Sequence, residues 1–414
     1  IEAAARTLAA DHKHNKRKLA VHVGLHSPIL LQEAREMRGV LHKDNDTIEA
    51  RPFSLDEMAA RNLLQRQGAI MMAAAEGQDH DHPHLVMFGF DDAAEAVAVR
   101  ALMSLWSARF DGPRITVVTP TPQEASDNFD ARYPHARAHD NWKADIVFKQ
   151  FDWRTRAVSE TILQEIAAER GPASFILVST GVDAENIALA LGVVRACNAS
   201  EDKKWAVPIY MKEASESEFS RQFAKGDLTK EKDAYLQAFG SVERVATRAM
   251  ILDGSLDSGA AMAHQIYQHG LENRGEMAGK ELEAARRTWG DVGETYRNAN
   301  RAVADHAMMK LWDLGWMPAP AGVKGETHPE IPEEDVMKVA EMEHSRWMAE
   351  RMMAGWRPGE KRDNKRRIHP NLVPWEALTQ SDKDKDADQV RGALTLARAM
   401  HKNGFVKRPA EPMA

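Results

Sequence analysis

Short apolar runs alternate with amphipathic stretches between residues 84 and 213, and this alternation restricts the fold more than any other feature. The apolar runs occupy residues 85–90, 114–120, 144–152, 174–180 and 205–211. Helix-forming stretches over residues 91–110, 159–171 and 183–198 separate most of them. Strands that are apolar on both faces are typical of parallel sheets covered by helices. The pattern therefore predicts an α/β fold with a Rossmann-like, doubly wound parallel sheet.

A repeat precedes this unit. Residues 1–23 align without a gap with residues 187–209, and Phe53 aligns with Phe239 in a second matching block. We interpret residues 1–78 as the back half of a first α/β domain, whose front we expect upstream of Ile1, followed by a complete second domain over residues 79–270. The alternative is a chance likeness between two helix-then-strand pairs. Residues 271–330 are predicted to be a helical connector and linker, and residues 331–414 a separate domain.

The string STGVDAENIALAL, with Asp183 and Asn186 at the start of a helix, resembles the TrkA-N family of Rossmann-like domains. That family regulates potassium channels and transporters in response to nucleotides, so the resemblance implies NAD or another adenine nucleotide as a ligand. The candidate cofactor-binding residues are Gly89, Phe90, Asp91, Thr119, Ser179, Thr180, Asp183 and Asn186.

The phosphate-binding turn departs from the dinucleotide pattern. Such turns carry three glycines so that the backbone can approach the pyrophosphate, but here only Gly89 is present and Asp91 and Asp92 follow it. Carboxylates cap a helix well, yet they repel a pyrophosphate. We therefore favour a Rossmann-like shell for dimerisation and signal transmission over an intact NAD site, and keep both hypotheses.

The C-terminal segment carries a dense pattern of histidine, tryptophan, glycine, proline and charged residues. Its members are His344, Trp347, Gly355-Trp356, Gly359, Lys361-Arg362-Asp363, His369-Pro370, Leu372, Pro374-Trp375, Leu378 and Lys383. This pattern resembles the ryanodine-receptor (RyR) repeat. The repeat implies a mainly α-helical domain with two helices enclosing a long ordered loop. The stretch 288–316 resembles the segment that precedes this repeat in bacterial proteins that also carry TrkA-N-type domains. Within it, Arg301 and Asp305 lie on one helical face, which suits either a solvated surface or an interdomain or ligand-facing role.

Tryptophans and arginines concentrate in the repeat. Planar rings beside guanidinium groups suit a stacked purine and a phosphate held by arginine; the alternative is a small core of indoles with solvated arginines. The candidate ligand-binding residues are His344, Arg346, Trp347, Arg351, Trp356, Arg357, Arg366, His369 and Trp375.

Composition excludes several classes of protein. A net charge of −7 provides no basic field for nucleic acid. The single Cys197, with no partner in sight, indicates a buried apolar side chain in a reducing cytoplasm. The histidine-rich string at residues 79–84 could hold a transition metal, but we interpret it as a solvated linker and predict no metal site.

These features favour a cytoplasmic, ligand-sensing regulatory protein over an enzyme. We expect a nucleotide-like small molecule at the RyR repeat, a homodimer or higher homo-oligomer, and membrane contact only through a segment upstream of residue 1, as in channel regulators or antiviral effectors. An NAD(P)-linked oxidoreductase is the first alternative, and a structural scaffold is the second.

Overall fold

The computed structural model describes residues 19–26, 28–41, 48–76, 81–137, 144–200, 205–218, 221, 236–273, 286–320 and 322–408. Within these ranges, no helix combines the length and apolarity needed to cross a bilayer. The repeat block at residues 1–18 lies outside them.

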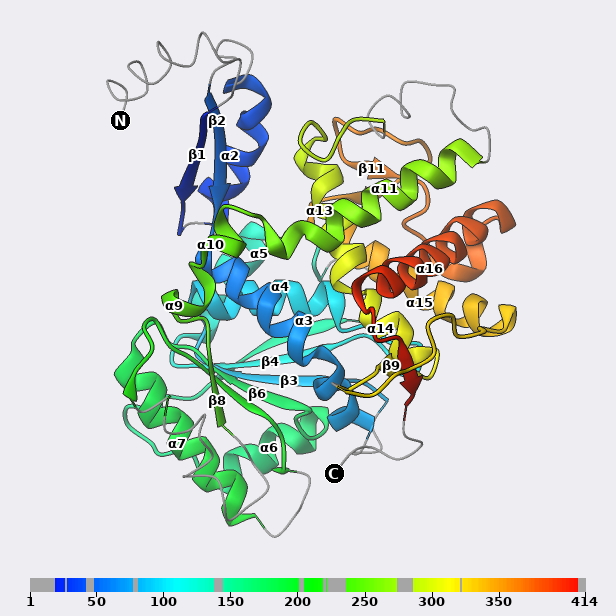
Figure 1. Ribbon diagram of the computed structural model, residues 1–414. Coiled ribbons are helices and arrows are strands. Elements are labelled where there is room, and N and C mark those ends of the chain that lie inside the picture. The colour runs from blue at the N-terminus through cyan, green and yellow to red at the C-terminus, as the bar shows by residue number, and fades with distance from the viewer. Residues whose placement is uncertain are drawn as a thin grey trace.

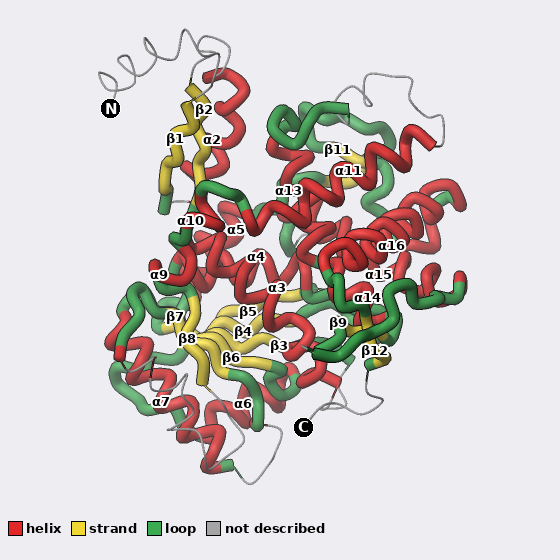
Figure 2. The backbone as a smooth tube through the Cα atoms, viewed as in Figure 1, coloured by secondary structure: helices red, strands yellow, loops and turns green. Residues whose placement is uncertain are grey.

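Six parallel strands form the central sheet, as Figures 1 and 2 show. They are β3 (His84–Phe88), β4 (Arg114–Thr119), β5 (Asp145–Gln150), β6 (Phe175–Val178), β7 (Ile209–Lys212) and β8 (Leu236–Phe239). Their spatial order is β5-β4-β3-β6-β7-β8, which is the order of a doubly wound dinucleotide-type sheet. From β3 the chain adds β4 and β5 toward one edge of the sheet, and it then adds β6, β7 and β8 toward the other. The predicted α/β fold is confirmed, and β8 adds a sixth strand to the five apolar runs.

Two separate cores lie on the two faces of the sheet, and alternate residues of the inner strands face one core or the other. Leu85 and Met87 of β3 face one core, whereas Val86 and Phe88 face the other. The first core includes α4 (Asp92–Ser104) and α5 (Pro122–Arg132), and the second includes α6 (Glu160–Arg170) and α7 (Asp183–Ala199). Continuous apolar strands are thus explained by burial on both faces.

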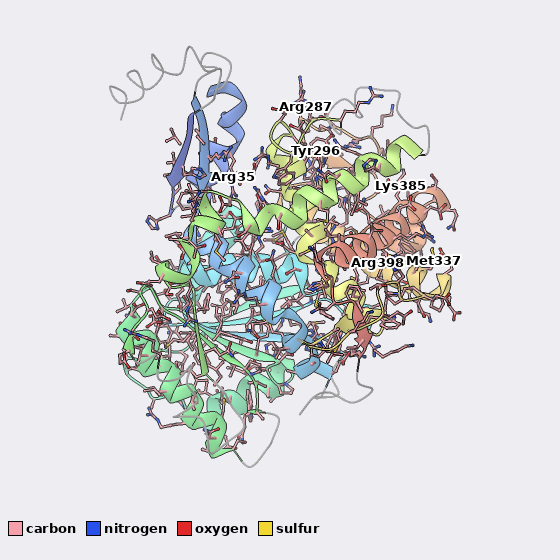
Figure 3. All side chains as sticks on the ribbon, viewed as in Figure 1. Arg35, Arg287, Tyr296, Met337, Lys385 and Arg398 are labelled. Atoms are coloured by element: carbon pink, nitrogen blue, oxygen red, sulfur yellow. The ribbon has the colours of Figure 1, made fainter. Side chains whose placement is uncertain are left out.

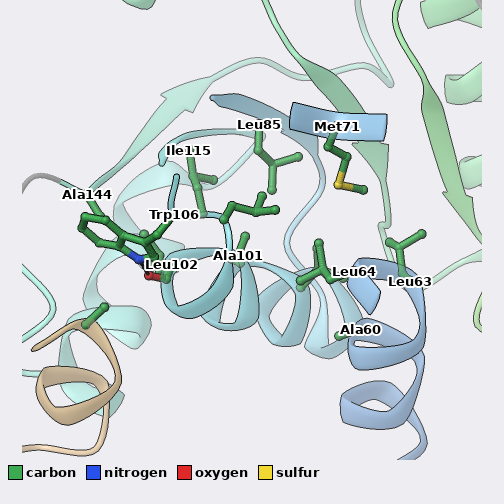
Figure 4. Packing of buried hydrophobic residues seen from close by; sticks show 14 of the residues in the cluster. Ala60, Leu63, Leu64, Met71, Leu85, Ala101, Leu102, Trp106, Ile115 and Ala144 are labelled. Carbon is green, nitrogen blue, oxygen red and sulfur yellow. Dashed lines mark hydrogen bonds between the residues drawn. The ribbon is translucent and has the colours of Figure 1, made fainter. Parts of the chain in front are cut away.

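Helix α3 (Leu55–Glu76) belongs to the first core. Figure 4 shows Leu64 and Met71 of α3 facing the same interior as Ala101 of α4 and Leu85 of the sheet. A segment expected to end the first repeat copy therefore supplies part of the core of the following unit. We call residues 55–239 the sheet unit.

A small β-α-β unit lies ahead of α3, comprising β1 (Leu19–Gly24), α2 (Pro28–Leu41) and β2 (Ile48–Phe53). Strands β1 and β2 pair in parallel, as β7 and β8 do, and each pair is followed by a helix. In Figure 1 this unit stands apart from the six-stranded sheet.

After β8 the chain forms a connector of short and long helices. These are α9 (Val242–Val245), α10 (Arg248–Ile251), the 3-10 turn η2 (Ser255–Asp257), α11 (Ser258–Asn273), α13 (Glu294–Asp305) and α14 (Ala307–Asp313). Helices α11 and α13 pack on each other and on the last long helix of the chain.

The C-terminal helical unit spans residues 316–408. It contains β9 (Trp316–Pro318), α15 (Glu333–Met353), β10 (Arg357–Pro358), β11 (Ile368–His369), the 3-10 turn η3 (Trp375–Ala377), α16 (Gln380–Met400) and β12 (Phe405–Lys407). Helices α15 and α16 pack together and a long ordered loop runs between them, as predicted. The stretch expected to be a linker is held in place, because the backbone of Glu326 bonds to Phe405 in both directions.

Candidate functional site

The turn after β3 is held by contacts with Ser179, which follows β6, and with the start of α4. Gly89 adopts φ +90°, and a Cβ at this position would lie 2.1 Å from the backbone oxygen of Ser179. This approach between neighbouring strand ends explains why glycine stands here. Asp91 caps α4 by accepting from the backbone N–H of Ala94 at 2.9 Å, and it also accepts from the Ser179 hydroxyl at 2.7 Å.

The other candidate cofactor residues at this sheet edge have internal partners as well. Asn186 accepts from both the backbone N–H and the hydroxyl of Thr180 at 2.8 Å and donates to the carbonyl of Lys212. Asp183 accepts from the backbone N–H of Ala214. Thr119 is buried at the end of β4, and Phe90 packs edge-on against Phe148. The structure thus brings these residues together at the carboxyl ends of the strands, where the polar ones hydrogen-bond to the turns that follow the strands.

Aromatic rings from α15 and the following loop form one continuous cluster. His344 stacks on Trp347 and lies 6.0 Å from the ring of Trp375. His369 bridges Trp347 and Trp356, with ring centroids 4.9 and 6.1 Å away. Burial lowers the pKa of His369 to about 4, so its ring is neutral at physiological pH.

The predicted arginines divide into three groups. The Arg351 guanidinium lies over the rings of Trp347 and Trp356, at 5.8 and 5.3 Å. Arg346 is only 1% exposed and forms two bonds to Glu343, so its guanidinium serves the core. Arg357 and Arg366 lie exposed on the loop surface.

A cavity of about 270 Å³ lies where the C-terminal helical unit meets the sheet unit and the connector. Its wall includes Leu31 and Arg35 of α2, Glu95, Ala96, Val99 and Met103 of α4, Asn298 of α13, and Trp356, Asn364 and Arg367 of the C-terminal unit. We call it the Trp356 cavity. Of the candidate ligand residues, Trp356 alone lines it.

Arg367 is a wall residue that sequence reasoning missed. Among the described residues, Arg367 is the only one other than glycine that has a positive φ, of 54°. Its guanidinium donates to the carbonyl of Ala354. The sequence places Arg367 in the same basic run as Arg366, but it gives no sign of which one has the left-handed backbone that turns it inward. Left-handed non-glycine residues cost free energy and cluster at functional sites.

Buried ion pairs hold the connector against the sheet unit. Arg61 of α3 binds Asp305 of α13 through two nitrogens and also Asp257 of η2 at 2.7 Å. Arg301 of α13 binds Asp257 as well. Arg301 also pairs with Glu294 within α13, but its bonds to Asp257 and the bonds of Asp305 to Arg61 reach other elements, which supports the interdomain role for this helical face.

A second buried cluster joins the connector to the C-terminal helical unit. The Glu343 carboxylate contacts Lys310 Nζ and Arg346 Nε, each at 2.8 Å. His306 lies 4.0 Å from the same carboxylate and bonds through Nε2 to the carbonyl of Trp106. All four ionisable side chains are 0 or 1% exposed. The Lys310 ammonium and the Arg346 guanidinium therefore share one carboxylate in the interior, where burial lowers the pKa of Lys310.

The pH dependence of stability should report on Glu343. Burial alone would raise the pKa of Glu343, but Arg346 and Lys310 outweigh it and lower that pKa to about 2. Because the folded pKa lies below the ordinary value, this stabilisation is complete above about pH 4.5 and is lost as pH falls toward 2. In urea unfolding between pH 6 and 3, we expect Glu343→Gln to lose less stability on acidification than the unmodified protein. Equal losses would contradict the assignment.

Two other sequence motifs take structural roles. His84 bonds to Gly171 and Thr116, and His82 bonds to Asp81 and the carbonyl of Arg170. Residues 79 and 80 of the histidine-rich string lie outside the described ranges. In the described part of the chain, no three or more His, Cys, Asp or Glu side chains group so that they could hold a metal ion. Cys197 is buried, and burial raises the pKa of its thiol to about 12.

Comparison with protein families bears on the C-terminal helical unit. Residues 316–405 match the family model of the RyR domain. The chain therefore contains an RyR domain. The match begins at β9, so the RyR domain includes the ordered stretch before α15 and the strand pair β9–β12 that closes it. Trp356, Asn364 and Arg367 are then the contribution of the RyR domain to the cavity wall.

Proposed function

We propose that this protein is a ligand-sensing regulatory protein, and that the Trp356 cavity binds a nucleotide-like small molecule. The observation that carries the proposal is the composition of the cavity wall. The RyR domain, the connector and helix α4 of the sheet unit all contribute side chains to it. A molecule bound there touches three parts of the chain at once, so its binding favours one arrangement of these parts over others.

The chemistry of the wall suits a planar, hydrogen-bonding ligand. Trp356, Val99 and Met103 supply apolar surface. The side-chain oxygens of Asn298 and Asn364 accept from Arg301 and Arg362, and their NH2 groups can donate to the edge of a base. Ligand pockets combine mainly apolar walls with a few oriented polar groups in this way. Nucleobases have both features, which favours a nucleotide over a purely apolar ligand.

Arg367 supports the same assignment. Its left-handed backbone costs on the order of 1 kcal/mol or more, a strain that persists only where the surrounding structure holds it. The strain places a guanidinium in the cavity wall, beside the loop carbonyl of Ala354. We propose that Arg367 contacts the bound molecule directly, in the role that the sequence suggested for Arg366.

In this proposal the sheet unit is a platform rather than a dehydrogenase. Asp91 already occupies the N-terminus of α4 and places negative charge where a pyrophosphate would bind. That geometry favours the regulatory role over the oxidoreductase alternative. The change in arrangement caused by ligand binding would then be transmitted from the RyR domain through α4 to a second copy of the chain or to another partner.

Filling the cavity tests the proposal. Ala96 of α4 is half-buried and lines the cavity, so Ala96→Trp should block it. We expect calorimetric titration of the unmodified protein with adenosine, ADP, ATP, ADP-ribose and NAD to detect binding by at least one of them. Affinity for that compound should fall at least tenfold in Ala96→Trp.

Ala377→Trp is the matched control, because Ala377 is exposed in the RyR domain and is not part of the cavity wall. It should bind as the unmodified protein does. Absence of binding to every compound would favour the structural scaffold instead, and equal binding by Ala96→Trp would place the ligand outside the Trp356 cavity.

A further inference from the structure

Carboxylates supply part of the polar surface of the Trp356 cavity. Its wall contains Glu57, Glu95, Glu294 and Glu350. Glu95 and Glu350 are only 3 and 5% exposed, and the other two are half-buried. A carboxylate oxygen can accept more than one hydrogen bond, and a carboxylate holds the ribose hydroxyl in dinucleotide-binding folds. This wall therefore suits a part of the ligand that carries hydroxyl and amino groups.

The guanidinium groups of the same wall already have partners. Arg35, labelled in Figure 3, extends from α2 and contacts Glu57 and Glu294, at 2.7 and 3.4 Å. Arg100 of α4 binds the other oxygen of Glu57 at 2.6 Å. Arg367 donates to a loop carbonyl. A phosphate inside the cavity would add negative charge to a wall whose cations are engaged, and burial of a charge without its own partner is strongly unfavourable.

Two of the wall carboxylates are ionised at physiological pH. Burial alone would raise the pKa of Glu57, but Arg35 and Arg100 outweigh it and hold that pKa well below its usual value. Burial likewise opposes the ionised form of Glu294, whose pKa Arg301 and Arg35 lower. These negative charges balance the arginines that line the cavity.

The same ion pairs close one side of the Trp356 cavity. A neighbouring cavity of about 360 Å³ lies between the β1–α2–β2 unit, α3 and the start of α13. Both walls contain Arg35, Glu57 and Glu294, so this ion-pair group separates the two spaces. A ligand beside Trp356 is thus confined to about 270 Å³, below the roughly 300–1,000 Å³ of most small-molecule sites. A space of this size favours a single nucleoside over a whole dinucleotide.

The Trp356 cavity reaches the surface beside Gln32 and Asn364, which are exposed residues of its wall. Arg362 and Lys365 lie next to Asn364 in the loop, and both are exposed. Phosphates that extend through this opening stay in water and meet exposed side chains. Ion pairs between exposed groups contribute little to affinity, and salt screens them.

We propose that the Trp356 cavity encloses the base and ribose of its ligand and leaves the phosphates outside, at the opening beside Asn364. This inference rests on the proposed function and specifies which part of the ligand is recognised. That part is the nucleoside, which contacts the Trp356 surface, the amide groups and the carboxylate oxygens of the wall. A nucleoside and its phosphates then bind with nearly the same affinity.

The ratio of the affinities for ATP and adenosine tests this inference. Calorimetric titration of the unmodified protein at about 0.1 M and about 1 M salt shortens the Debye length from roughly 10 to 3 Å. At the lower salt we expect ATP to bind at most about fivefold more tightly than adenosine, which is the contribution of an exposed ion pair. At the higher salt the two affinities should be equal, and adenosine should bind alike at both.

Ala96→Trp, with Ala377→Trp as its control, tests whether the nucleoside occupies this cavity. Ala96→Trp should weaken the binding of adenosine and ATP by the same factor, at least tenfold, whereas Ala377→Trp should weaken neither. ATP binding that survives in Ala96→Trp would contradict the inference, because the phosphates would then hold the ligand at another place.

The remaining outcomes separate this inference from the proposed function. If ATP stays more than fivefold tighter than adenosine at about 1 M salt, the phosphates lie inside the protein and this inference is overturned, while the proposed function stands. The same holds if ADP-ribose or NAD binds and adenosine does not. If none of these compounds binds the unmodified protein, the proposed function itself fails and this inference fails with it.

Discussion

Replacing Glu343 by alanine is expected to lower the free energy of unfolding by about 3–5 kcal/mol, the cost of removing one partner from a buried ion pair. Lys310 and Arg346 would remain in the interior, 0 and 1% exposed, without their shared carboxylate. The two buried cations would then lose the carboxylate that lies nearest to both of them. Urea unfolding followed by circular dichroism measures the change directly.

Glu341→Ala is the matched control, since Glu341 is exposed on the same helix. It should change stability by less than about 0.5 kcal/mol. A sharper version replaces the whole group, with Lys310→Met, Glu343→Leu and Arg346→Met combined. Apolar substitution of a complete buried ion cluster is often neutral or stabilising, so the triple variant should recover most of the lost stability. A triple variant less stable than Glu343→Ala would contradict this account.

Arg61→Ala is expected to cost about 3 kcal/mol, at the lower end for a buried ion pair. Arg61 is 5% exposed and bonds to Asp305, Asp257 and the carbonyl of Leu256. Arg301 still pairs with Asp257 after the change, which keeps the loss at the lower end. Since Arg61 joins α3 to the connector, hydrogen exchange should increase in α13 as well.

Arg61→Lys separates charge from geometry, because lysine keeps the charge but cannot make the paired bonds to Asp305. It should fall between Arg61→Ala and the unmodified protein. Arg66→Ala removes an exposed arginine from the same helix and should be nearly neutral. If Arg61→Ala were as stable as Arg66→Ala, the connector would not depend on this contact.

The central strands could be predicted because their side chains are buried on both faces of the sheet, which makes each strand a continuous apolar run. Leu85 to Phe88 is buried on both faces, and so short an apolar run is typical of a strand in a parallel sheet covered by helices. β8 was harder to find, since Gln237 and Ala238 are half-buried at the edge of the sheet and its apolar signal is weak.

The RyR domain shows the same division between prediction and structure. Its tryptophans were predicted to lie beside arginines, and the Arg351 guanidinium does lie over the rings of Trp347 and Trp356. The arginines beside them were indistinguishable in sequence. Arg346 points into the core, and Arg367 reaches the cavity through a backbone conformation that residue identity does not encode.

The sequence by itself determined the α/β class, the parallel strands and the RyR domain, because each depends on local patterns of apolar, glycine and aromatic residues. Only the tertiary structure decided which charges are buried together and where the cavities lie. Glu343 meets Lys310 and Arg61 meets Asp305 across 33 and 244 residues of chain. Such meetings depend on how helices pack in space, and no local periodicity records them.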